Sequence, residues 1–213
     1  MANDKTGLLL VNLGTPEQPT AAAIRRWLKE FLLDRRVVQL PRLIWLPILY
    51  CFILPFRPRR LADTYKEIWL EQGSPLMVIS ERQRAALAGA LKNDHVQVEL
   101  AMRYGQPAIA PALQQLSNKS VEKILVLPLY PQYSHTTTGS VKDAVNHAMQ
   151  ETDLPPVDGI DDYHDDPGYI EALANRVQRF REQHGPGDKL LISWHGIPQA
   201  YVEQGDPYAD QCE

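Results

Sequence analysis

Residues 123–129 read Lys-Ile-Leu-Val-Leu-Pro-Leu, a short apolar run with a charged residue at its start and a proline-rich turn after it. A hydroxyl-rich segment and then a helical pattern follow. Similar runs recur along the chain and alternate with longer helical patterns, which is typical of βαβ units. The sequence therefore predicts an α/β fold with a parallel sheet. The expected strands are Gly7–Asn12, Val96–Met102, Lys123–Leu129, Val157–Asp162 and Lys189–Ser193.

Four of the expected helices carry clear start signals. Thr20 and Ser74 are suited to cap helices, and Pro75 suits the first position of the second helix, which we expect to run through Leu87 and Leu91. Gln106-Pro107 and Asp166-Pro167 open the other two. The apolar faces of three of these helices would be Ile24, Trp27, Leu28, Phe31 and Leu32, then Ile109, Leu113 and Leu116, and finally Ile170, Leu173, Val177 and Phe180.

The length and composition are those of a globular protein with one full domain and part of a second. The chain has 213 residues, of which 44% are hydrophobic and 23% charged. We expect a first α/β domain over 1–162, a connecting helix and breaker over 163–188, and the beginning of an incomplete second α/β domain over 189–213. The strongest breaker, His184–Asp188, lies at the end of the connector.

Charge and cysteine content exclude several classes of protein. Lys and Arg number 22 against 26 Asp and Glu, a net charge of −4, so we expect no nucleic-acid partner. Cys51 and Cys212 share no metal-type spacing, which argues against a disulfide framework or a zinc knuckle and favours a reducing compartment. Met1–Thr6 lacks the pattern of a signal peptide, so we expect a cytoplasmic protein.

One apolar segment, Leu40–Phe56, has two open interpretations. Its uninterrupted part, Leu43–Phe56, is shorter than the ~20 residues that a membrane-spanning helix needs, and Pro47 divides it. It is either a buried core helix or an exposed apolar lip that meets a greasy ligand or a membrane surface. Arginines directly after it would suit the headgroup level of a membrane.

Polar or special residues follow the expected strands, where the parallel-sheet rule places ligand sites. Asn12–Pro16 contains a glycine turn without a dinucleotide or Walker pattern, so a tight turn beside a cleft is favoured over a phosphate cradle. Arg103 suits either an anionic ligand group or an ordinary surface ion pair. The run Tyr130–Ser140, rich in hydroxyl groups, favours ligand contact over simple helix capping.

His195 differs from the other histidines because it ends an apolar run, Leu190–Trp194, and precedes Gly196 and Pro198. A neutral imidazole there can accept a proton near neutral pH or bind a divalent metal. A lone histidine is more often a satisfied structural residue, so its position alone leaves both interpretations open.

Several strings together resemble the ferrochelatases, most closely the bacterial protoporphyrin type, from about Lys5 to the last residue. They are Leu10–Pro16, Gln72–Leu76, Arg103–Gly105, Leu127–Ser134, Ser193–Pro198 and Gly205–Tyr208. The resemblance implies a chelatase-like, Rossmann-type α/β domain with a second similar one across a porphyrin cleft. It also implies insertion of ferrous iron into protoporphyrin IX, the step that forms protoheme.

The resemblance also implies roles for individual residues. His195 matches the family's motif histidine, which acts there as iron ligand or as acceptor of pyrrole protons, and is our expected catalytic and metal-binding residue. Leu40–Phe56 would be the family's apolar lip, with peripheral membrane contact. The expected substrate-binding residues are Leu13, Tyr65, Arg103, Tyr104, Tyr130 and Thr136.

The sequence departs from the family in two places. Some members have a cysteine ligand of an iron–sulfur cluster where His135 stands, and Cys212 has no suitable partners, so we expect no cluster and no tightly bound cofactor; Fe²⁺ is a substrate. The family's catalytic glutamate motif does not occur in the 213 residues, so we expect a C-terminally truncated chain with impaired activity. The alternatives are a tetrapyrrole-binding module without metallation activity and a non-functional fragment.

Overall fold

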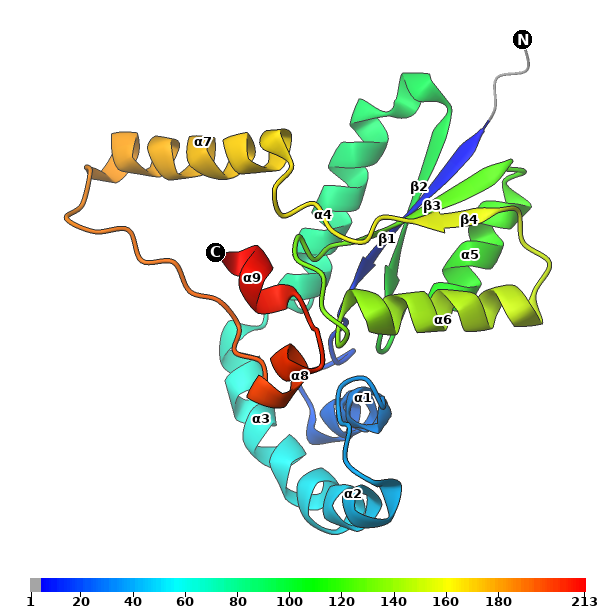
Figure 1. The fold of residues 1–213 in the computed structure, drawn as a ribbon, viewed down its shortest axis with the longest axis vertical. Helices are drawn as coiled ribbons and strands as arrows, with labels where there is room; N and C mark the ends of the chain where they lie inside the picture. The colour runs from blue at the N-terminus through cyan, green and yellow to red at the C-terminus, as the bar shows by residue number, and fades with distance from the viewer. Residues whose placement is uncertain (1–4) are drawn as a thin grey trace.

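The computed structural model describes residues 5–213 and contains a parallel sheet of four strands in the order β2-β1-β3-β4 (Figure 1). Its strands are β1 (Thr6–Asn12), β2 (Val96–Met102), β3 (Lys123–Pro128) and β4 (Val157–Gly159). The predicted α/β class and four of the predicted strands are confirmed, although β4 ends before the predicted Asp162. Residues 1–4 lie outside the described residues. They belong to the predicted first domain, 1–162, and to Met1–Thr6, the stretch that lacks the pattern of a signal peptide.

The central strand β1 is buried on both faces because helices cover both sides of the sheet. It pairs in parallel with β2 (Leu9 opposite Glu99) and with β3 (Leu9 opposite Val126). Leu9 and Val11 pack toward α5 (Ile109–Asn118) and α6 (Thr138–Glu151). The alternate residues Leu8 and Leu10 pack toward α4 (Pro75–Ala90). A parallel sheet covered on both faces explains the unbroken apolar character of this strand.

The predicted helix caps are present at three of the four starts. Thr20 Oγ1 accepts a hydrogen bond from Ala23 N (3.3 Å) at the start of α1 (Ala21–Leu33). Ser74 Oγ accepts from Met77 N (3.2 Å) before α4, and Asp166 Oδ1 accepts from Tyr169 N (2.9 Å) before α7 (Pro167–His184). By contrast, α5 begins only at Ile109, after the predicted Gln106-Pro107 start.

The turn after β1 is tight, as the sequence favoured. Gly14 has φ +106°, and a Cβ there would lie 1.8 Å from the backbone oxygen of Tyr104. Tyr104 N also donates to Leu13 O (2.9 Å). Only glycine allows the two backbones to approach this closely.

The lip segment, Leu40–Phe56, forms a bent helical arm that is buried on one part of its surface and exposed on the rest, so each of the two interpretations of the sequence holds in part. It runs through α2 (Arg42–Ile48), a π-helical turn η1 (Leu49–Ile53) and the start of α3 (Leu54–Ile68), and it packs on α1 (Figure 1). Trp45, Leu49 and Leu54 are buried, whereas Leu43 is 91% exposed. Among the described helices, none combines the length and the apolar character that crossing a bilayer would require. The segment is therefore half core and half exposed apolar surface.

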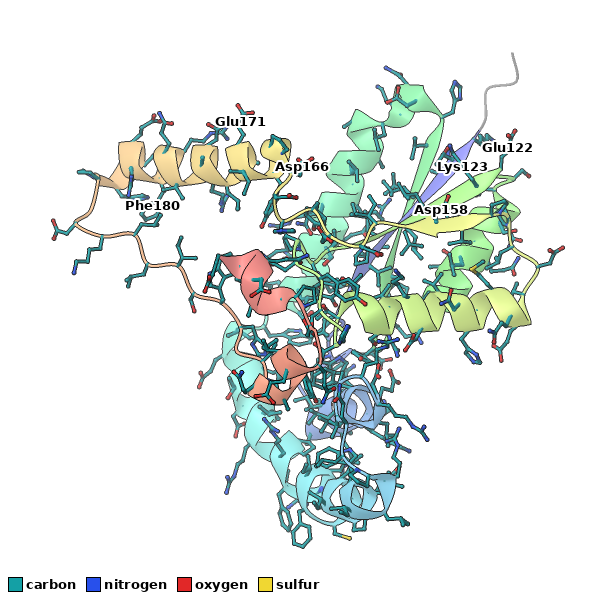
Figure 2. The ribbon with its side chains drawn as sticks, in the orientation of Figure 1. Glu122, Lys123, Asp158, Asp166, Glu171 and Phe180 are labelled. Atoms are coloured by element: carbon teal, nitrogen blue, oxygen red, sulfur yellow. The ribbon has the colours of Figure 1, made fainter. Side chains whose placement is uncertain are left out.

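The predicted strand Lys189–Ser193 is wrong. Within residues 5–213 this run is an extended chain without sheet partners, and Leu191 is 88% exposed. The physical reason is that a strand needs a neighbouring strand, and α7 carries the chain away from the sheet (Figure 1). Figure 2 shows Phe180 on this outlying helix, where its side chain is 62% exposed. The division into a connector over 163–188 and a second domain from 189 remains a prediction.

The last part of the chain returns to the carboxyl edge of the sheet. Two short helices, α8 (Gln199–Glu203) and α9 (Tyr208–Cys212), lie there. Elsewhere in the chain, a short 3₁₀ turn, η2 (Lys92–Asp94), precedes β2. Tyr201 of α8 donates its hydroxyl to Val37 O (3.0 Å), which follows α1. Segments far apart in the sequence thus meet at one end of the sheet.

Candidate functional site

A cavity of about 420 Å³ lies at the carboxyl edge of the sheet. Leu13 follows β1, Tyr130 follows β3, and Thr136 lies on the loop that leads into α6; all three line it. His195 lines it from the C-terminal part of the chain. The structure thus brings together four residues that the sequence singled out, at the place where open parallel sheets bind ligands.

Three other predicted site residues, Tyr65, Arg103 and Tyr104, do not line this cavity. Tyr65 lies on α3, half-buried in the apolar cluster beneath the lip, with its ring 6.3 Å from that of Trp69. Arg103 and Tyr104 follow β2 and turn toward the end of α1 instead.

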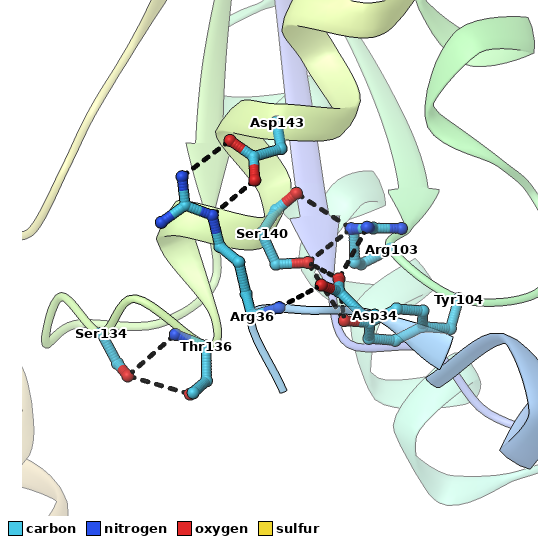
Figure 3. A network of polar contacts seen from close by, with 8 residues as sticks. All are labelled: Asp34, Arg36, Arg103, Tyr104, Ser134, Thr136, Ser140 and Asp143. Carbon is cyan, nitrogen blue, oxygen red and sulfur yellow. Dashed lines mark hydrogen bonds and ion pairs between the residues drawn. The ribbon is translucent and has the colours of Figure 1, made fainter. Parts of the chain in front are cut away.

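Arg103 and Tyr104 belong to a polar network centred on Asp34, the residue after α1 (Figure 3). Asp34 Oδ2 accepts hydrogen bonds from Arg103 Nη2 (2.8 Å), the Tyr104 hydroxyl (2.8 Å) and Ser140 Oγ (2.5 Å). Arg103 Nε also donates to Ser140 O (2.9 Å). Arg103 therefore forms an ion pair, but not the ordinary surface pair that the sequence offered as one interpretation, because the two side chains are only 22% and 8% exposed.

The electrostatics of this network favour an ionised Asp34 and a neutral Tyr104. Burial opposes the charge of Asp34, but hydrogen bonds from Ser140, Tyr104 and the Arg36 amide, together with Arg103, lower its pKa below the usual 3.8. Burial, against the bond from Ser140, raises the pKa of Tyr104 well above its usual value. Sequence reasoning missed Asp34, because its side-chain partners lie 69 or more positions away and it carries no local motif. Ser140 belongs to the run that was expected to contact a ligand, but in the structure its hydroxyl bonds to Asp34.

The polar network around Asp34 is in contact with one wall of the cavity through Tyr104. The ring of Tyr104 meets the ring of Phe31 edge-on, with centroids 5.2 Å apart, and Phe31 lines the cavity. Fixing Tyr104 through Asp34 therefore fixes one apolar wall of the cavity.

Tyr130 presents an unusual hydroxyl. Within residues 5–213 this buried hydroxyl has no hydrogen-bond partner. Burial raises the pKa of Tyr130 far above its usual value, so the phenol is neutral at physiological pH. A buried donor without a partner is costly, which makes this group a candidate for hydrogen bonding to a ligand.

The remaining lining is mainly apolar, including Leu129, Ile197 and Pro198, and it also contains the hydroxyl groups of Ser134 and Thr137. His195 is the one metal-ligating type of side chain among the lining residues, which include no Asp or Glu. A single imidazole is too few ligands for a resident metal ion, and the mainly apolar lining suits an apolar ligand. A separate surface group, Asp162, His164 and Asp165, has ligand atoms within 4.8 Å of one another but does not line the cavity.

Comparison with known proteins identifies the family of the chain. The family model described as Ferrochelatase matches residues 5–213. Proteins named ferrochelatase are 54% identical in Aeromonas hydrophila, 51% in Hamiltonella defensa and 48% in Bordetella pertussis. These matches cover 98%, 100% and 98% of this chain, but 65%, 66% and 58% of the relatives. The chain thus spans less than two thirds of the length of the curated relatives that it matches, and it belongs to the ferrochelatase family.

Proposed function

We propose that the protein inserts ferrous iron into protoporphyrin IX, and that this chain supplies the porphyrin-binding wall and one proton- or metal-handling group. The observation that carries the proposal is the apolar cavity at the carboxyl edge of the sheet, with the His195 imidazole among its lining residues. A stiff, flat, largely apolar macrocycle matches such a lining. Membership of the ferrochelatase family supports the same substrate.

Four of the residues that line the cavity have specific roles in this proposal. Leu13 packs against the face of the ring, and the unpartnered Tyr130 hydroxyl and the Thr136 hydroxyl bind its polar groups. Insertion of Fe²⁺ replaces the two inner pyrrole protons, which must leave with a base. His195 either accepts these protons or delivers the ion as a ligand. We assign Arg103 and Tyr104 a supporting role, because both bond to Asp34 and Tyr104 packs on Phe31, which lines the cavity. We assign Tyr65 to the apolar cluster beneath the lip.

A second candidate function is tetrapyrrole binding without metallation. It is favoured by one observation: the lining residues include no carboxylate to share the proton transfer with His195. Both candidate functions predict that the chain binds porphyrin, but only the first predicts that the bound porphyrin is metallated.

The experiment mixes the 213-residue chain with protoporphyrin IX and ferrous iron without oxygen and follows the loss of free-porphyrin fluorescence. The variant is His195→Ala, and the matched control is His184→Ala, an exposed histidine at the end of α7. Metallation that falls at least about tenfold in His195→Ala but not in the control supports iron insertion. Saturable binding without metallation would favour the second candidate, and equal rates in both variants would refute the role of His195.

We also propose that the exposed face of the lip contacts a membrane surface. Phe52 and Phe56 are 66% and 62% exposed and lie beside Arg57 and Arg60 along one groove. Apolar side chains next to basic ones are suited to the boundary between acyl chains and anionic headgroups.

The lip proposal is tested by co-sedimentation with vesicles that contain anionic lipid. Phe56→Ser should weaken binding, whereas Phe180→Ser, at an equally exposed phenylalanine of α7, should not. The same loss in both variants would show non-specific adsorption instead of a lip contact.

A further inference from the structure

Asp206 is a fully buried carboxylate that links the C-terminal part of the chain to the loop after β3. Its side chain is 0% exposed. Oδ2 accepts hydrogen bonds from Ser134 Oγ (2.8 Å) and His135 N (2.8 Å), and Oδ1 accepts from Tyr208 N (3.1 Å). The sequence placed Asp206 in a family string but gave it no role.

The burial of this carboxylate makes the link specific. A buried charge is costly unless hydrogen bonds satisfy it, and here both oxygens have donors. A shift of the C-terminal segment along the loop would leave the charge unpaired. Asp206 therefore fixes the register between the two segments.

The loop side of this link reaches the cavity. Ser134 Oγ lies 2.9 Å from Thr136 Oγ1 and accepts from Thr136 N (3.2 Å), as Figure 3 shows. Ser134 and Thr136 both line the cavity. Asp206 thus holds the part of the loop that forms one wall.

The other side of the link reaches His195. The Tyr208 hydroxyl accepts a hydrogen bond from His195 N (3.2 Å), and Tyr208 is itself fixed by Asp206. The segment before His195 offers no comparable support, because Leu191 is 88% exposed and the run has no sheet partners within residues 5–213. The position of His195 therefore depends on contacts that follow it in the sequence.

We propose that Asp206 is a positioning residue: through Tyr208 on one side and Ser134 on the other, it holds His195 against the cavity wall. The use of His195 in metallation rests on the proposed function, but the positioning itself does not. The test therefore has one arm without ligand and one arm with protoporphyrin IX.

The first arm measures amide hydrogen exchange in the 213-residue chain. In Asp206→Ala, exchange in 195–208 and at His135 should become at least about tenfold faster, because charged hydrogen bonds are lost on both sides. Asp206→Asn retains one acceptor oxygen and should lie between that variant and the parent. The matched control, Asp210→Ala, removes an exposed carboxylate of the same segment and should leave exchange unchanged.

Where Asp206→Ala disturbs folding, a second and milder variant still tests whether His195 is held in place. Tyr208→Phe removes only the hydroxyl that binds His195 N, so exchange should rise at His195 and stay unchanged at His135. Exchange at His195 that matches the parent in Tyr208→Phe, or exchange in 195–208 that matches the parent in Asp206→Ala, would overturn the proposal.

The second arm titrates protoporphyrin IX. Asp206→Ala should weaken binding at least as much as His195→Ala, because it releases both His195 and the Ser134–Thr136 part of the wall. The double variant should be no weaker than Asp206→Ala alone, because the contribution of His195 depends on Asp206. Additive losses would overturn the positioning role. If the parent chain binds no porphyrin, the proposed function fails while the exchange arm still decides the role of Asp206.

Discussion

Asp34→Ala should destabilise the protein through the network behind the cavity. The change removes four hydrogen bonds, from Arg36 N (2.7 Å), Arg103 Nη2, the Tyr104 hydroxyl and Ser140 Oγ. Breaking a buried ion pair costs about 3–5 kcal/mol. The Arg103 side chain is 22% exposed and keeps its bond to Ser140 O, so water and Ser140 offset part of that loss. We expect a loss of about 3 kcal/mol in the free energy of unfolding.

The matched control is Asp143→Ala, which removes the other carboxylate in Figure 3. Asp143 accepts from Arg36 at Nη2 (2.8 Å), but the two side chains are 37% and 52% exposed. Exposed pairs contribute about 0–1 kcal/mol, so the two variants should differ by about 2 kcal/mol or more.

The assay is urea unfolding followed by tryptophan fluorescence, with four tryptophans as probes. At a slope of about 2 kcal/mol per molar urea, Asp34→Ala should lower the midpoint by about 1–2 M, and Asp143→Ala by less than about 0.5 M. Equal midpoints for the two variants would refute the reasoning that burial makes Asp34 the centre of the network.

Two further predictions concern pH and the turn after β1. Because the folded-state pKa of Asp34 lies below 3.8, its contribution is present above that value and is lost as the pH falls through the folded-state pKa. The stability gap between the parent and Asp34→Ala should therefore shrink in acid unfolding; a gap independent of pH down to about 2 would contradict this. Gly14→Ala should destabilise the chain far more than Gly73→Ala in thermal melting. Both positions have positive φ and a strain of about 1–3 kcal/mol, but only at Gly14 would a Cβ meet the backbone. Similar melting temperatures would show that the close approach to Tyr104 does not matter.

Local patterns were enough to predict the sheet and most helix starts. Three of the four observed strands, β1 to β3, are mainly apolar runs, and β4 (Val-Asp-Gly) is a short one with a single apolar residue. Thr20, Ser74 and Asp166 each make the expected cap contact. These features depend on residues within a few positions of one another, so the sequence displays them directly.

Features that depend on distant partners were not predicted. Leu190–Ser193 has the composition of a strand, but composition does not supply the neighbouring strand that pairing needs. Arg103 suited either a ligand or an ion pair, and its ion-pair partner, Asp34, lies 69 positions away, so the sequence could not show the pair. The approach of Asp206 to Ser134 spans 72 positions and has no local signal.

The candidate site was predicted only in part. Leu13, Tyr130 and Thr136 meet at one cavity because the segments that follow parallel strands share one edge of the sheet. His195 reaches that cavity through the contacts of Tyr208 and Asp206, and not at the end of the strand that the sequence predicted.

Binding of protoporphyrin IX to the parent chain, to Leu13→Asp and to Leu191→Asp tests most directly whether this cavity is the porphyrin site. Leu13 lines the cavity, whereas Leu191 is 88% exposed outside it, so the same new charge is placed in two different settings. We expect saturable binding by the parent and by Leu191→Asp, and an affinity at least about tenfold weaker in Leu13→Asp, because a buried unpaired charge is costly. No saturable binding by the parent, or equal affinity in the two variants, would contradict the assignment of the cavity.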